Sequence, residues 1–130
     1  NMAEKLMIPD TQGNKYGEVR ISNDVIAVIA GMAVCDEPGL YIDGKTPGEF
    51  IDRSNAKNIS RAIKIEVVEG AVVATLTIAV EYGVNITALC NSVQEKVKQA
   101  VQTMTNLTVA RVDISVQELL FRKDKGEQKK

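Results

Sequence analysis

Histidine and tryptophan are both absent from this 130-residue chain. Without an imidazole, the chain lacks the commonest general base, the commonest metal ligand and every catalytic triad that depends on histidine. The two cysteines, Cys35 and Cys90, are too few for a tetrahedral zinc site, and we expect both to be buried, reduced thiols in apolar helical patterns. The sequence therefore nominates no catalytic, cofactor-binding or metal-binding residue and predicts a protein that is not an enzyme.

Aromatic residues are scarce, and the formal net charge is only -1 at pH 7. Proteins that bind nucleic acid use stacking aromatic side chains or a basic groove, and neither pattern is visible here. No apolar run reaches the roughly 18 residues that a membrane-spanning helix needs. We therefore expect no nucleic-acid partner, a cytoplasmic location, and only peripheral association with a membrane.

The chain divides into three parts by composition. Residues 1–15 mix charge, proline and glycine without a period, which predicts a flexible lead-in. Residues 122–130 hold five basic and two acidic residues, which predicts a charged tail. Residues 16–121 are rich in aliphatic and β-branched side chains and are long enough to bury a core. This central part is predicted to be a single α+β domain.

Hydrophobic periodicity predicts the element order β-α-loop-β-β-α-β. The predicted elements are a strand over 16–21, a largely buried helix over 24–36, a hairpin over 63–80 that turns at Glu69 and Gly70, a helix over 86–105, and a strand over 110–117. Residues 37–61 are rich in turn formers and predict a long surface loop with one helical turn near Phe50. The simplest packing is a small mixed β-sheet with two helices on one face.

One segment matches a phosphate-binding loop letter for letter. Residues 39–46, from Gly39 to Thr46, fit the pattern G-x-x-x-x-G-K-[ST], in which Lys45 would reach the phosphates and Thr46 would hold magnesium. The context differs from that of a true phosphate loop, because the segment follows a predicted helix and is itself followed by Pro47. Nucleotide binding through residues 39–46 is therefore kept as the alternative prediction.

Three stretches carry a resemblance to a known family. They are residues 17–31, from the predicted first strand into the buried helix; residues 80–86 with 93–101 and 104–107, which lead into the long helix and include much of it; and residues 112–117 in the last strand. Together they resemble the alkaline shock, envelope stress-response protein family of Gram-positive bacteria, although residues 41–58 are more polar than that family's glycine-rich connection. The resemblance implies no catalytic residues. It implies a small cytoplasmic protein linked to cell-envelope homeostasis, and some members gather at the membrane through a membrane-embedded partner.

The favoured function is therefore that of a non-enzymatic interaction and assembly protein linked to the cell-envelope stress response. We expect it to self-associate or to dock to a membrane-anchored partner. The surfaces that could serve are the exposed sheet edges, the polar face of the helix over 86–105, and the loop over 37–61.

Overall fold

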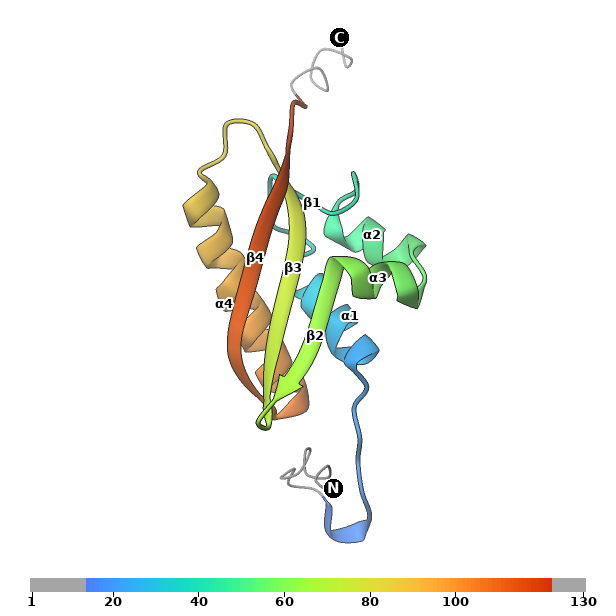
Figure 1. The fold of residues 1–130 in the computed structure, drawn as a ribbon. Coiled ribbons are helices and arrows are strands. Elements are labelled where there is room, and N and C mark those ends of the chain that lie inside the picture. The colour runs from blue at the N-terminus through green and yellow to red at the C-terminus, as the bar shows by residue number, and fades with distance from the viewer. Residues whose placement is uncertain (1–13, 123–130) are drawn as a thin grey trace.

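The computed structural model describes residues 14–122, so most of the predicted lead-in and the tail beyond Arg122 lie outside the described residues. The predicted α+β class is confirmed (Figure 1). The elements, in chain order, are η2 (Asn14–Tyr16), α1 (Asn23–Ala33), β1 (Leu40–Tyr41), α2 (Pro47–Arg53), α3 (Ala56–Ala62), β2 (Ile63–Val68), β3 (Ala71–Glu81), α4 (Ile86–Thr105) and β4 (Thr108–Leu120).

Strand β3 is the centre of a mixed, four-stranded sheet. On one side it pairs antiparallel with β2 up to Leu76 and then with β1 from Ala79. On the other side it pairs in parallel with β4 along its whole length. Helix α4 connects these two parallel strands, as a parallel pair requires. The predicted hairpin is confirmed, and its turn residues Glu69 and Gly70 both have positive φ, as a two-residue turn between twisted strands needs.

The hydrophobic core lies between the sheet and two helices. Helices α1 and α4 pack against each other, and they cover one face of the sheet (Figure 1). Side chains that alternate along β3 enter this core, and the residues at i, i+4 and i+8 of α4 meet them. These core residues include Val72, Ala74, Leu76, Ile78 and Val80 of β3 and Val93, Val97 and Val101 of α4. Among the helices of residues 14–122, none combines the length and the apolar composition needed to cross a bilayer.

The predicted strand over 16–21 is wrong. Residues 17–22 form no regular secondary structure, with a bend at Gly17, and pair with no strand of the described chain. Helix α1 starts directly afterwards, with the hydroxyl of Ser22 accepting a hydrogen bond from the N–H of Val25 at 3.2 Å. Alternation is a local property of a sequence, whereas strand pairing needs a neighbouring edge, and none lies beside this segment.

Helix α1 is also less buried than its composition predicts. It ends at Ala33, and its outward side exposes Val25, Val28 and Met32. Apolar side chains project from every side of α1, but the sheet and α4 cover only one side of the helix. The predicted burial is therefore wrong for the outward half of α1.

The predicted surface loop over 37–61 is wrong as well, because this region contains β1, α2 and α3; only the helical turn predicted near Phe50 is confirmed, within α2. The side chains of Thr46 and Asn55 cap the two short helices by accepting hydrogen bonds from main-chain N–H groups at 3.3 and 2.8 Å. Pro47 occupies the first turn of α2, where proline is tolerated. Residues that predict a loop are therefore helix caps here, and Phe50 and Ile59 anchor the region in the core.

A charged contact joins the connection after α1 to helix α4. One carboxylate oxygen of Glu37 accepts hydrogen bonds from Ser92 Oγ at 2.8 Å and from Lys96 Nζ at 2.9 Å. The Lys96 ammonium also lies 3.5 Å from Asp36. The hydrogen bond with Glu37, reinforced by the two negative charges, raises the pKa of Lys96. The contact holds the chain in place as it leaves α1 and approaches β1.

Replacing Lys96 by methionine is expected to lower the free energy of unfolding by about 1 kcal/mol, because the largely buried Glu37 carboxylate loses its cation. A raised folded-state pKa stabilises the protein below the ordinary lysine value of 10.5, and this contribution is lost as pH rises through the higher folded value. The difference between variant and wild type should therefore shrink above pH 10.5 in urea unfolding. Lys98→Met, on the exposed side of α4, is the matched control. A loss from Lys96→Met that stays constant through the alkaline range would contradict this account.

Candidate interaction surface

The segment that resembles a phosphate loop forms a tight turn. Ile42 and Lys45 exchange both of their main-chain hydrogen bonds, at 2.8 and 3.0 Å. The two residues between them, Asp43 and Gly44, have φ values of 53° and 76°. Positive φ at both central residues is the geometry of a two-residue hairpin turn. In a nucleotide site, the main-chain N–H groups of this segment would bind phosphates. Here the N–H groups of Ile42 and Lys45 donate to carbonyls within the turn instead.

The other half of the match is a helix cap. The hydroxyl of Thr46, which would hold magnesium in a nucleotide site, accepts a hydrogen bond from the N–H of Glu49 at 3.3 Å. Helix α2, which follows, was predicted only as one helical turn near Phe50, and it has seven residues. Strand β1 lies inside the matched segment and not before it. A phosphate loop needs a buried strand leading in and a long helix leading out, so nothing in this geometry favours nucleotide binding.

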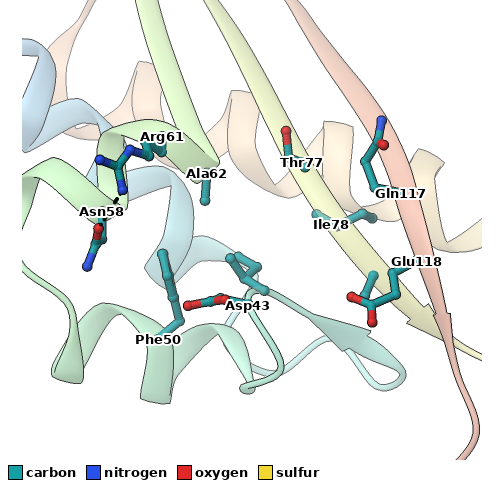
Figure 2. A pocket seen from close by; sticks show the side chains of 11 residues that line it. Asp43, Phe50, Asn58, Arg61, Ala62, Thr77, Ile78, Gln117 and Glu118 are labelled. Carbon is teal, nitrogen blue, oxygen red and sulfur yellow. Dashed lines mark hydrogen bonds between the residues drawn. The ribbon is translucent and has the colours of Figure 1, made fainter.

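A pocket lies where pairing along β3 is interrupted (Figure 2). Strand β2 pairs with β3 only as far as Leu76, and β1 begins its pairing at Ala79, so Thr77 and Ile78 border the gap. The pocket has a volume of about 310 Å³, and its other walls come from helix α3, the turn after β1, Phe50 of α2, and Gln117 and Glu118 of β4.

Charged side chains of both signs surround this pocket. Arg61 lies on the α3 side, where its Nη1 donates a hydrogen bond to Asn58 at 3.0 Å. Asp43 and Glu118 contribute carboxylates from the turn and from β4. All three charged residues are exposed. The pocket lining presents charges to solvent and contains no buried acid, base or nucleophile, so it offers no catalytic arrangement.

Two glutamines of α4 contact the main chain of β4. Gln94 Nε2 donates to the carbonyl of Val112 at 3.0 Å, and Gln102 Oε1 accepts from the N–H of Val109 at 3.0 Å. The polar side of α4 was predicted as a contact surface, but these two residues are engaged within the chain. Their side chains form hydrogen bonds with main-chain groups of Val109 and Val112, in the first half of β4.

The second half of β4, residues 113–120, is the open part of the sheet edge. Strand β4 pairs with β3 on one side, and no strand of residues 14–122 pairs with it on the other. The glutamine contacts extend only as far as Val112. An edge strand presents a row of main-chain donors and acceptors to which another chain can add a strand.

Apolar side chains border this open edge. Val116 and Leu119 lie opposite Ile78 and Val80 in the parallel pairing, so they point to the face of the sheet that the helices cover. They nevertheless remain 37% and 44% exposed, whereas Ile78 and Val80 are buried. The helices therefore bury these residues of β3 but leave the neighbouring side chains of the second half of β4 partly exposed to solvent.

An aromatic pair continues the apolar surface. The rings of Tyr82 and Phe121 stack with centroids 5.1 Å apart, and both side chains are exposed. The N–H of Tyr82 donates to the carbonyl of Leu120 at 2.7 Å, which places the pair at the end of the β3–β4 ladder. We call Val116, Leu119, Phe121 and Tyr82 the apolar end of β4. The sequence prediction ended this strand at Gln117 and missed Leu119 and Phe121, although the apolar run over 119–121 was a usable signal.

The cysteines contribute little to this surface. Cys35 lies beyond the end of α1 and is exposed, so the prediction that it is buried is wrong. Cys90 lies within α4 and is half-buried, and this burial raises the pKa of its thiol. The environment of Cys90 is not one that would activate a thiolate, because such environments lower the thiol pKa.

Residues 11–121 match the family model described as the ASP23 family, with a cell envelope-related function. The number belongs to the family's name and not to a residue. This chain belongs to the ASP23 family. The match covers nearly all of the described chain and every helix and strand of the sheet domain. It confirms the resemblance found in the sequence, and the family description names a cellular context and no reaction.

Three bacterial proteins are similar to this ASP23-family chain over most of their length. The uncharacterized protein YqhY of Bacillus subtilis is 26% identical over 89% of this chain and 87% of the relative. The uncharacterized protein YloU of the same organism is 32% identical over 79% of this chain and 88% of the relative. The uncharacterized protein Spy1535 of Streptococcus pyogenes is 28% identical over 82% of each. No solved structure matches the chain.

Proposed function

We propose that this member of the ASP23 family is a non-enzymatic interaction protein, which serves a cell envelope-related function by pairing strands at the free edge of β4. The observation that carries the proposal is the second half of β4, where an open strand edge adjoins the apolar end of β4. Edges that combine free main-chain groups with exposed apolar side chains accept a strand from another chain. The addition of one strand would form hydrogen bonds with the free main-chain groups and would also cover the exposed apolar side chains.

The proposed partners are a second copy of the chain and a membrane-embedded anchor protein. A partner strand would extend the sheet through main-chain hydrogen bonds and would cover Val116 and Leu119. Each square ångström of apolar surface that it removes from water contributes about 25 cal/mol. The family's envelope-related function supports a cytoplasmic protein held at the inner face of the cell membrane by such contacts.

The double variant Val116→Lys, Leu119→Lys is expected to weaken self-association at least about tenfold, because lysines at a strand edge oppose pairing with another strand. Both side chains are already partly exposed, so the monomer should remain folded. Val68→Lys is the matched control, since Val68 is an exposed valine in β2, an edge strand on the other side of β3. Light scattering and sedimentation velocity at increasing protein concentration measure the effect, with circular dichroism as the check on folding.

Two results would contradict the proposal. One is a wild-type chain that stays monomeric at high micromolar concentration and also fails to sediment with cell-envelope membranes. The other is equal weakening by the control Val68→Lys, which would show that added positive charge, and not the β4 edge, decides association.

A further inference from the structure

Residues 17–21, which we call the arm, have no regular secondary structure and pair with no strand of the described chain. Glu18 and Arg20 are two residues apart and form an ion pair at 3.2 Å, so their side chains lie on the same side, as in a strand. Val19 is 53% exposed, and Ile21 alone packs against the core. The arm therefore has the alternating side chains from which the sequence predicted a strand, but its apolar residue Val19 is exposed to water.

The arm leaves the molecule on the side away from β4. At the start of α1, Asn23 Nδ2 donates to the carbonyl of Ile65 at 3.2 Å, which places this end of the helix beside β2. From there the arm runs away from the sheet (Figure 1). The open edge of β4 lies beyond β3, on the opposite side of the sheet from β2. The chain thus carries a strand-like donor and a strand-accepting edge on different sides.

We infer that the arm of one copy adds as a strand to residues 113–120 of β4 in a second copy. This inference rests on the proposed function, because it names the segment that fills the proposed edge. The arm spans about 17 Å when extended, so it fits within that half of β4. Because the arm and the open edge belong to the same chain, each copy can donate its arm to the edge of another copy.

The side chains of the two segments also match. The apolar side of the arm carries Val19, and the exposed apolar side of β4 carries Val116 and Leu119. When the two strands pair with these residues on one face, Glu18 and Arg20 lie on the other face together with the polar residues of β4. Those polar residues are Asp113, Ser115 and Glu118.

The predicted contact joins two different surfaces, so it is heterologous. A symmetric pairing of one β4 with another would instead use the same surface twice. This difference gives a test that separates the arm from the edge. A chain with a damaged arm keeps its acceptor edge, and a chain with a damaged edge keeps its donor arm.

The experiment compares Val19→Asp, which damages the arm, with the edge variant Val116→Lys, Leu119→Lys. Val25→Asp is the matched control, because Val25 is a similarly exposed valine at 50% exposure on α1. We expect Val19→Asp to weaken self-association at least about tenfold and Val25→Asp to leave it unchanged. Neither damaged variant should self-associate, but an equimolar mixture of the two should form a one-to-one complex. Hydrogen exchange in that complex should slow at residues 17–21 of the edge variant and at residues 113–120 of the arm variant.

Three outcomes would overturn the inference. If Val19→Asp self-associates as wild type does while the edge variant does not, the arm is excluded and the proposed function stands. If the two variants fail to form a complex, the contact is not arm to edge. A wild-type chain that is monomeric at every concentration would remove the second copy as the partner.

Discussion

Replacing Phe50 by alanine is expected to lower the free energy of unfolding by about 3–5 kcal/mol. Phe50 belongs to α2, in a region whose composition predicts a surface loop, yet its ring is only 1% exposed and is part of the core cluster. Removing the ring leaves a cavity between α2 and the rest of the core, and the loss is a large fraction of the stability of a domain of this size. Urea unfolding followed by circular dichroism measures it.

Phe121→Ala is the matched control for this prediction. Phe121 is 64% exposed, and its ring stacks on that of Tyr82. Its removal should cost no more than about 1 kcal/mol. Equal losses from the two phenylalanines would mean that α2 does not share the cooperative core of the domain.

Replacing Gly39 by alanine is expected to lower the free energy of unfolding by about 2–4 kcal/mol. Gly39 has φ of +81°, a region that is unfavourable for a residue with a Cβ atom. A Cβ atom at this position would also lie 2.6 Å from Cγ1 of Val84. The carbonyl of Gly39 accepts a hydrogen bond from the N–H of Glu81 at 2.9 Å, so the chain has little freedom to move away. Urea unfolding again provides the measurement.

Gly44→Ala separates the two causes of this loss. Gly44 has a similar φ of +76°, but nothing lies within 4 Å of an added Cβ atom. Its replacement should therefore show the backbone strain alone, about 1–2 kcal/mol. If both variants lose the same stability, the close approach of Val84 relaxes without cost and the larger estimate for Gly39 is wrong.

The parts of the fold that sequence predicted well are those with strong local signals. The predicted helix over 86–105 has the same bounds as α4, because its apolar residues recur at helical spacing and Asn85 and Asn106 cap its ends. The hairpin was predicted from two alternating runs around Glu69 and Gly70. In both cases residues close in sequence decide the structure.

The failures have a different physical cause. Whether residues 17–21 form a strand depends on an edge elsewhere, and the described chain provides none beside them. Two seven-residue helices are too short to display a clear period, and their capping residues resemble those of a loop. For the candidate surface, the sequence predicted that sheet edges would matter, but it could not show that Gln94 and Gln102 occupy one half of β4.

The parallel pairing of β3 with β4 also constrains how the chain folds. The two strands are separated by the 20-residue helix α4, so their pairing requires a long loop to close before any contact between them forms. Non-local pairing of this kind slows folding, whereas the β2–β3 hairpin can form from neighbouring residues. Until β4 arrives, one side of the central strand is open along its full length to strands of other nascent chains. Pairing of β4 with β3 thus prevents strands of other chains from adding to β3. The rate of this pairing sets how long a newly made molecule can misassemble.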